Sequence, residues 1–304
     1  MSNITMMKFM FTKSIPTRPI LKWMLMTALL TGCSSASLVY NNADWLVRGK
    51  IDDYFSLSGP QKQQLKSNIN SILQWHRQQE LVKYSDLLNQ FTQQYANGLN
   101  SEELDLFFDK VTSARIRLVE ASIPAASQFL STVSIKQINY YDQVLLKKRV
   151  KRAKELDNSS NEYAEENFTR FIENMEDWFG DFDKSQIKKM RIISDARPDN
   201  RQYWFDQNKL RHKKFIELLR SHPSKAIIEQ YLYDRFVALK RTDAQEQDMT
   251  RQVRLYWMSA FLSIDKIILT KQREHLIDRL TNYSTDFLTL SKQSSKPIKN
   301  RVQR

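Results

Sequence analysis

The sequence predicts an all-α protein made of irregularly stacked antiparallel helical hairpins with long amphipathic helices. The first observation is a scarcity of turn-forming residues, since the 304 residues include only five glycines and seven prolines. A β-sandwich or an α/β fold of this length needs more of both in its turns. The second observation is that apolar residues recur every three or four positions, and no stretch alternates with a period of two. The third is a helix-start signal that recurs along the chain.

The longest periodic stretch begins near Leu65, reaches Tyr95 and skips one turn at Glu80, which predicts a single long helix. Similar faces run from Tyr203 through Leu210 to Leu219 and along the C-terminal part of the chain. Together with the intervening turn formers, these patterns predict helices at residues 41–56, 59–96, 101–121, 125–155, 161–179, 184–195, 199–220, 224–240 and 245–290, the last with a break or kink near Thr270.

Capping boxes mark several of these helix starts. In each, a residue that suits the N-cap position is followed three positions later by Glu or Gln, and an apolar residue precedes it. The copies are Ser58-x-x-Gln61, Asn100-x-x-Glu103, Ser134-x-x-Gln137 and Asp183-x-x-Gln186, and Leu269-Thr270-Lys271-Gln272 resembles a shortened fifth copy. Their spacing is irregular, which favours stacked hairpins over a repeat of fixed period.

The N-terminus has the order of a secretory signal peptide. Four basic residues precede a short apolar run, and the run ends at Leu30-Thr31-Gly32-Cys33, which contains the only cysteine. The run is far shorter than the roughly 20 residues that a membrane-spanning helix needs. This ending resembles the bacterial lipobox, so we predict a lipoprotein signal peptide at residues 1–32 and lipidation of Cys33. A signal peptide without lipidation is the alternative.

Resemblance to bacterial lipoproteins implies a diacylglycerol group on the sulfur of Cys33 and a further acyl chain, such as palmitate, on its amine. Several chains anchor a protein stably where one gives marginal binding. Ser34 and Ser35 follow the cysteine, in place of the aspartate that marks inner-membrane retention. We therefore expect the protein on the outer membrane, facing the periplasm. With a single cysteine, no internal disulfide is expected.

The mature chain is expected to form one helical domain over residues 33–290, with a soft division near 157–161, followed by a disordered basic tail at 291–304. The net charge is +13, of which the signal region contributes four positive charges and no acidic residue. A charge this far from zero concerns partners more than fold. In the periplasm the available anions are lipopolysaccharide, phospholipid headgroups, peptidoglycan carboxylates and acidic proteins, so nucleic acid is not an expected partner.

No catalytic motif, cofactor fingerprint or metal motif stands out, and we expect a protein that is not an enzyme and binds no cofactor. His76 and Glu80 lie four residues apart on a predicted helix but lack a third ligand nearby. A histidine partly buried beside Trp75 is the favoured interpretation. A site assembled from residues distant in sequence remains the alternative.

Basic clusters are the most distinctive feature of the mature chain. The first comprises Lys147, Lys148, Arg149, Lys151, Arg152 and Lys154, which are candidate anion-binding residues. Lys209, Arg211, Lys213 and Lys214 form a second group. The plain interpretation is a solvated helix face. Like charges one turn apart cost a helix a few tenths of a kcal/mol per pair, which favours compensation by packed acidic residues or by an external anion.

A family resemblance is carried by Ser37-Leu38-Val39-Tyr40-Asn41-Asn42-Ala43-Asp44-Trp45-Leu46 and by Trp75-His76-Arg77-x-x-Glu80-Leu81. These segments resemble a family of proteobacterial lipoproteins of unknown function, densely over residues 30–95 and more thinly to about 290. The resemblance implies an all-helical periplasmic fold. More remotely, Leu57-Ser58-x-x-Gln61 resembles the LTxxQ repeat of small periplasmic chaperones.

Three functions are consistent with these observations. The favoured one is a non-enzymatic binding, adaptor or chaperone-like module tethered to the membrane. The second is a structural envelope protein that contacts peptidoglycan or lipopolysaccharide. The third is a hydrolase acting on a cell-wall substrate.

Overall fold

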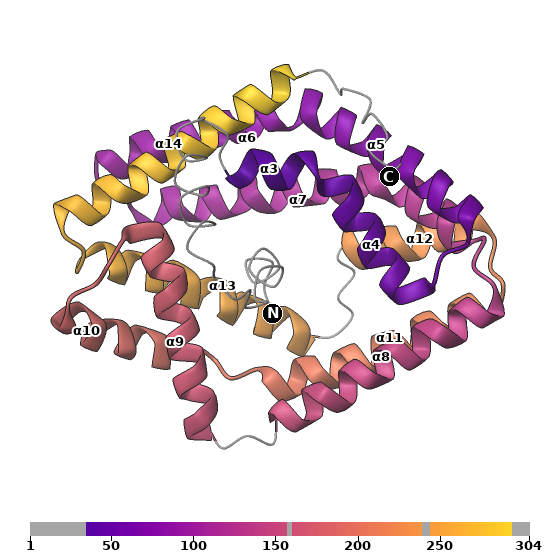
Figure 1. The fold of residues 1–304 in the computed structure, drawn as a ribbon. Coiled ribbons are helices and arrows are strands. Elements are labelled where there is room, and N and C mark those ends of the chain that lie inside the picture. Colours follow the sequence, from indigo (N-terminus) through magenta and orange to yellow (C-terminus); the bar gives the residue numbers. More distant parts are fainter. Residues whose placement is uncertain (1–34, 157–159, 239–243, 294–304) are drawn as a thin grey trace, which may run out of the picture. The chain divides into compact units, whose positions relative to one another are not determined.

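The computed structural model describes residues 35–156, 160–238 and 244–293. The predicted signal peptide, Cys33, nearly all of the basic tail and residues 157–159 of the expected soft division lie outside these ranges. Within them the chain is helical and contains no strand, which confirms the all-α prediction (Figure 1). The helices are α3 (Ser35–Asn41), α4 (Ala43–Phe55), α5 (Gly59–Gln79), α6 (Leu81–Ala96), α7 (Ser101–Leu130), α8 (Ile135–Leu156), α9 (Ser160–Phe179), α10 (Lys184–Asp195), α11 (Arg201–Arg220), α12 (Lys225–Phe236), α13 (Ala244–Asp265) and α14 (Thr270–Lys292).

The chain divides into two units, residues 1–43 and residues 44–304. Within the second unit, helices distant in sequence pack together. The helix pairs in contact include α6 with α14, α7 with α12, and α8 with α11. Helix α14 runs alongside α6, and α11 runs alongside α8 (Figure 1).

Two apolar cores hold the second unit together. The first joins α4, α5, α8, α11 and α12 with the end of α7, around residues such as Ile138, Ile228 and Leu219, none of which is more than 2% exposed. The second joins α6, α9, α10, α13 and α14 with the start of α7, around Tyr95 and Met190. Burial of such side chains supplies most of the favourable free energy of folding.

One predicted boundary, the start of the helix at 125, is wrong. Helix α7 continues through Pro124 to Leu130, and the next helix begins only at Ile135. A proline removes one helical hydrogen bond, here to the carbonyl of Glu120. Glu120 is exposed, so water can satisfy that carbonyl. Ile123, Phe129 and Leu130 are buried in the first core, which holds the last turns of α7 in place.

The single helix predicted over 59–96 is divided at Glu80, which separates α5 from α6, although its backbone N–H still donates to the carbonyl of His76 and its carbonyl accepts from Tyr84. Glu80 is only 1% exposed, and Arg117 of α7 contacts its carboxylate at 2.7 Å. The skipped turn in the periodicity coincides with this break, and the buried ion pair with α7 explains why a charged residue occupies a core position there. The predicted 41–56 helix begins at Ala43, after the separate helix α3 that was not predicted, and the predicted 224–240 helix ends at Phe236.

Candidate functional site

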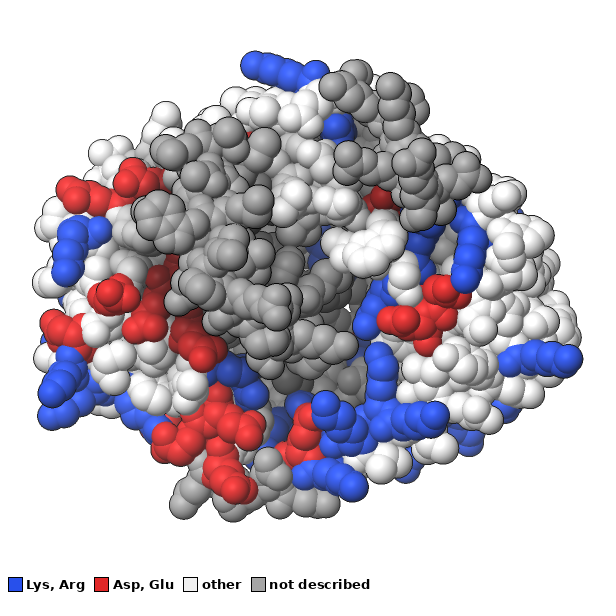
Figure 2. Space-filling model, viewed as in Figure 1, with Lys and Arg blue, Asp and Glu red and all other residues white. Residues whose placement is uncertain are grey.

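The positive charge of the chain concentrates on the packed pair α8 and α11. Helix α8 contains seven lysine and arginine residues and two acidic ones, and α11 contains six and two. Their net charges are +5 and +4. Removing the four positive charges of residues 1–32 from +13 leaves +9 for residues 33–304, the same as the sum for this helix pair. Figure 2 shows lysine and arginine side chains gathered over the C-terminal half of α8.

A groove of about 680 Å³ lies between α8 and α11. The start of α8 lies near the end of α11, since Arg220 contacts Asp142 at 3.1 Å. The two helices are therefore antiparallel along the groove. We call this cavity the α8–α11 groove. Its lining is Asp142, Leu146, Arg149, Val150 and Ala153 from α8, and Phe205, Asp206, Lys209, Leu210, Lys213, Ile216, Glu217 and Arg220 from α11.

The floor of the groove is apolar and open to solvent. Leu146 and Val150 are each 52% exposed, and Leu210 is 45% exposed. The sequence placed Leu210 on a packed helical face, but the structure places it in the groove. Exposed apolar residues that are scattered need no explanation, whereas a contiguous set framed by polar residues is typical of a binding site.

The rim of the groove carries charges of both signs. Arg220 pairs with Asp142, and Lys213 lies 3.9 Å from Glu217. Arg149 and Lys209 face the same groove, and neither has an ion-pair partner among the residues that the structure describes. With Asp206 the lining holds three carboxylates against four cations, so its own excess is one positive charge, and the exposed lysines of α8 add to it.

The structure separates the six candidate cations of α8 into two groups. Lys148 donates a hydrogen bond of 2.5 Å to the hydroxyl of Tyr54, and Arg152 pairs with Glu155 at 2.6 Å. Lys147, Lys151 and Lys154 are exposed and, with Arg149, have no partner within the described part of the chain. Among the described residues, Arg152 is the only one of the six paired with an acidic residue, and that residue, Glu155, lies one turn away on α8 and not on a packed neighbouring helix.

The neighbouring His212 adds no charge at neutral pH. Burial lowers the pKa of its imidazole, and the nearby guanidinium groups of Arg149 and Arg211 lower it further. Arg211 itself turns to α13, where it pairs with Glu246 at 2.7 Å. The second basic group of the sequence is therefore divided, with Lys209 and Lys213 in the groove and Arg211 outside it.

His76 lies in a separate polar cluster. It is 9% exposed, and its ring lies 6.3 Å from that of Trp75 and 5.3 Å from that of Tyr84. Burial lowers the pKa of His76, although the charge of Glu80 raises it. Among the described residues, no three His, Cys, Asp or Glu side chains form a potential metal site.

No helix in the described ranges is both long enough and apolar enough to cross a membrane.

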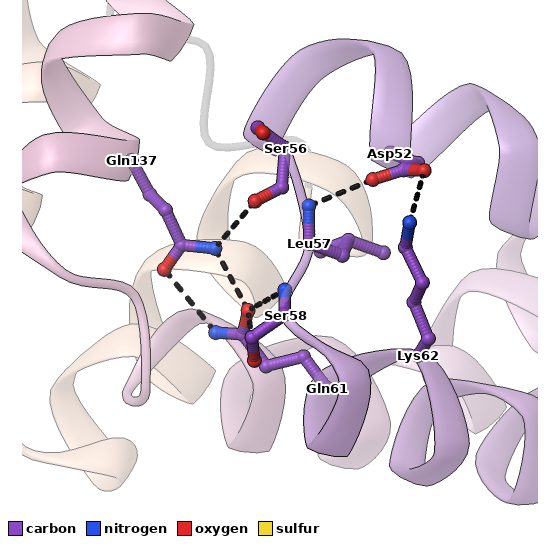
Figure 3. A network of polar contacts seen from close by, with 7 residues as sticks. All are labelled: Asp52, Ser56, Leu57, Ser58, Gln61, Lys62 and Gln137. Atoms are coloured by element: carbon purple, nitrogen blue, oxygen red, sulfur yellow. Dashed lines mark hydrogen bonds and ion pairs between the residues drawn. The ribbon is translucent and has the colours of Figure 1, made fainter.

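A reciprocal pair of glutamines positions the start of α8 (Figure 3). The Oε1 of Gln61 accepts from the backbone N–H of Ser58 at 3.1 Å, and the Oε1 of Gln137 accepts from that of Ser134 at 3.0 Å. Each amide then donates to the other, with Gln137 Nε2 at 2.7 Å from Gln61 Oε1 and Gln61 Nε2 at 3.3 Å from Gln137 Oε1. We call this arrangement a glutamine clasp. It joins the starts of α5 and α8.

The clasp also ties down the loops that precede both helices. Gln137 Nε2 donates to the carbonyl of Ser56, and Gln61 Nε2 donates to the carbonyl of Thr132, each at 3.4 Å. Asp52 holds the same loop from the other side, accepting from the backbone N–H of Leu57 at 2.7 Å (Figure 3). The bonds from Lys62 and from Leu57 hold the pKa of the Asp52 carboxyl below its usual range.

A second glutamine clasp joins the starts of α10 and α14. Gln186 Nε2 lies 2.7 Å from Gln272 Oε1, and Gln272 Nε2 lies 3.2 Å from Gln186 Oε1. The two amides also donate to the carbonyls of Ile267 and Asp181. The N-cap of α14 is Leu269, three residues before Gln272. This copy of the signal is therefore full length, whereas the sequence suggested a shortened one. Its box is half formed, because Gln272 accepts from Leu269 N–H and a leucine side chain accepts nothing.

In both clasps each glutamine donates to the carbonyl two residues before the partner's N-cap. The sequence revealed the individual capping boxes and missed their pairing. The available signal was the use of glutamine at the third helical position in four of the five copies, where Asn100 has Glu103 instead. A glutamine amide can accept and donate at once, whereas a carboxylate only accepts.

The profile of a family of unknown function, DUF6279, matches residues 53–235. The chain belongs to this family. The match contains all of the α8–α11 groove and the first glutamine clasp, while α13, α14 and the second clasp's Gln272 lie beyond it. No curated protein and no solved structure matches the chain.

Proposed function

We propose that this protein is a non-enzymatic binding module, an adaptor or chaperone-like protein, that binds acidic components of the bacterial envelope through the α8–α11 groove and its flanking cations. The observation that carries this proposal is the excess positive charge of α8 and α11 around an open apolar floor. Charge concentrated on one surface attracts anions and speeds their association. Exposed apolar area adds affinity that does not depend on salt.

The proposed location is the periplasmic face of the outer membrane, with the lipid anchor on Cys33. The support for it is the sequence Leu30-Thr31-Gly32-Cys33 followed by serine. Several helices begin with an apolar residue, an N-cap residue and, three positions later, a glutamine. This pattern also supports the proposal, because it recurs in the LTxxQ-type periplasmic chaperones.

A salt-dependent binding measurement tests this function. The full-length chain, held in nanodiscs of neutral phosphatidylcholine, is expected to bind lipopolysaccharide, phosphatidylglycerol vesicles or acidic envelope proteins. Binding should weaken steeply between low and physiological salt, as the screening length shortens to about 8 Å. Surface plasmon resonance at several salt concentrations gives the slope.

The α8 cations allow a sharper test than removal of the whole cluster. Changing Lys147, Arg149, Lys151 and Lys154 to Gln should remove most of the binding, and adding Lys148→Gln and Arg152→Gln should change little more, because those two side chains have internal partners. The matched control is Lys188→Gln with Lys189→Gln on α10, both exposed and unpaired in the described chain. Unchanged binding in the fourfold variant would show that the α8 cations form only a solvated helix face.

A second candidate function is a structural link to peptidoglycan or lipopolysaccharide. It is favoured by the composition of residues 291–304, which contain five basic residues and no acidic one. Truncation after residue 290 distinguishes the structural function from the groove function. The structural function predicts loss of envelope binding in the truncated chain, whereas the groove function predicts that binding persists.

A further inference from the structure

We propose that the occupant of the α8–α11 groove is an amphipathic helix with a net negative charge, supplied by another protein. This inference rests on the proposed function and names the class of partner for the same surface. The alternative occupants, an anionic lipid and lipopolysaccharide, are outcomes of the test below.

The shape of the groove fits a helix. Two antiparallel helices form its walls, and on α8 the lining runs from Asp142 to Ala153. At 1.5 Å per residue this stretch is about 16 Å long, or three turns of a third helix lying between the two. Leu146 and Val150 on one wall and Leu210 on the other present a row of apolar contacts to such a helix. Helices that bind in grooves use apolar residues spaced three or four apart in the same way.

The charges of the rim favour a peptide over a phosphorylated lipid. Three carboxylates, Asp142, Asp206 and Glu217, line the groove beside the cations. A phosphate group lying over this rim would face them, and like charges at close range cost binding energy. A peptide helix can place a lysine opposite each carboxylate and acidic residues opposite the unpaired Arg149 and Lys209. Three exposed lysines lie nearby, Lys147, Lys151 and Lys154. Their positive charge favours a partner with a net negative charge.

The tail of this chain is a poor occupant. Residues 291–304 are basic and contain no acidic residue, so their charge has the same sign as the excess on the rim. The partner is therefore a different protein. It has an acidic helix of about three turns whose apolar face is not packed against another helix until it binds.

The test uses a defined probe and the full-length chain in phosphatidylcholine nanodiscs. The probe is a fluorescent 16-residue peptide with leucines at helical spacing on one face and mostly glutamate on the other. A scrambled peptide of the same composition has no apolar face, and a third peptide has lysine in place of glutamate. Anisotropy should show binding of the first peptide at least tenfold tighter than of either control.

Variants in the groove separate its floor from its rim. Leu146→Ser with Leu210→Ser should weaken peptide binding at least tenfold at every salt concentration. Arg149→Gln with Lys209→Gln should weaken it several-fold at low salt and flatten the salt dependence. The matched controls are Ile192→Ser, at an exposed apolar position on α10, and Lys188→Gln with Lys189→Gln. Neither control should change binding by more than about twofold.

A crosslinking measurement keeps the proposal testable if a groove variant loses its fold. A photoreactive phenylalanine analogue at the exposed position Val150 should crosslink to the acidic amphipathic peptide, and the same group at Ile192 should not. Equal binding of the amphipathic and scrambled peptides, or equal crosslinking at the two positions, would overturn the inference. If lipopolysaccharide or phosphatidylglycerol vesicles bind through the groove and the peptide does not, the inference fails and the proposed function stands. If none of them binds, both fail.

Discussion

At the scale of single residues, Glu80 lies at the break between α5 and α6 and joins them to α7. Lys83 contacts its carboxylate at 2.8 Å and Arg117 at 2.7 Å. Burial alone would raise the pKa of Glu80, but the hydrogen bonds from Arg117 and Lys83 outweigh it and hold the pKa below its usual range. The buried carboxylate of Glu80 therefore ties the junction of α5 and α6 to α7, while its backbone keeps helical hydrogen bonds to His76 and Tyr84.

Replacing Glu80 with Gln should lower the free energy of unfolding by about 3 kcal/mol, the low end for breaking a buried ion pair, because Arg117 and Lys83 remain partly exposed to water. Urea denaturation measures the loss. The control is Glu120→Gln at an exposed position of α7, expected to stay within about 0.5 kcal/mol of the wild type. Equal effects of the two changes would show that the Glu80 ion pair contributes nothing to stability.

His76 should make stability depend on pH. Burial lowers the pKa of its imidazole below the ordinary 6.5, against the opposing charge of Glu80. A group with a depressed pKa in the folded state binds its proton more readily when unfolded, so its neutral form favours folding above about pH 6.5, and that stability is lost as the pH falls below it. The carboxyl of Glu80, also depressed, adds a second loss below its ordinary value of 4.5.

We therefore expect the melting temperature of the wild type to fall between about pH 7.5 and about pH 5, and His76→Phe to show a smaller fall. Phenylalanine keeps the aromatic contacts with Trp75 and Tyr84 and does not titrate in this range. His275→Phe, at an exposed position, should leave the pH dependence unchanged. Parallel curves for the wild type and His76→Phe would contradict the assignment.

At the scale of helices, the two glutamine clasps set which helix starts meet. One joins α5 with α8 and the other α10 with α14, across 76 and 86 residues of sequence. Gln186 and Gln272 are 5% and 2% exposed, whereas Gln61 and Gln137 are half-buried. A polar group that loses its partner costs more where water cannot replace it. The buried clasp should therefore contribute more to stability than the half-buried one.

A double-mutant cycle tests this difference. Gln186→Ala and Gln272→Ala should each lower the free energy of unfolding by about 1–3 kcal/mol, and the double variant by less than their sum. The same cycle at Gln61 and Gln137 should give smaller losses and a smaller coupling energy. Urea denaturation of the wild type and the six variants supplies the numbers. Strict additivity at Gln186 and Gln272 would mean that the two amides act only as separate caps.

At the scale of the whole molecule, charge is distributed unevenly. The net charge of α8 and α11 together equals that of residues 33–304, so the rest of those residues is neutral on balance. This uneven distribution of charge fits the proposed function, in which the basic surface binds acidic partners. The proposed anchor at Cys33 would decide whether that surface works at a membrane or in solution.

Replacing Cys33 with Ala tests the anchor. In cells, labelling by a clickable palmitate analogue should be lost, because the sulfur that accepts the diacylglycerol group is gone, and the protein should leave the membrane fraction. Ser34→Ala is the control and should keep both. Equal labelling of the wild type and Cys33→Ala would refute the lipoprotein assignment.

The sequence alone determined the class of fold and most of the helix bounds. Apolar spacing and caps are local properties of the chain, so α10 was predicted at 184–195 and found at Lys184–Asp195. The break at Glu80 and the continuation of α7 through Pro124 were not predicted correctly. Both depend on contacts with other helices, which local spacing does not encode.

The candidate site follows the same division. The sequence alone identified Lys147 to Lys154 and the group from Lys209 to Lys214 as unusual, because charge is visible residue by residue. Only the tertiary structure decided that Arg149, Lys209 and Lys213 face one groove, that Lys148 is held by Tyr54, and that the capping glutamines pair. The physical reason is that packing α8 against α11 fixes the rotation of each helix about its axis. That rotation selects which side chains meet a partner and which remain exposed.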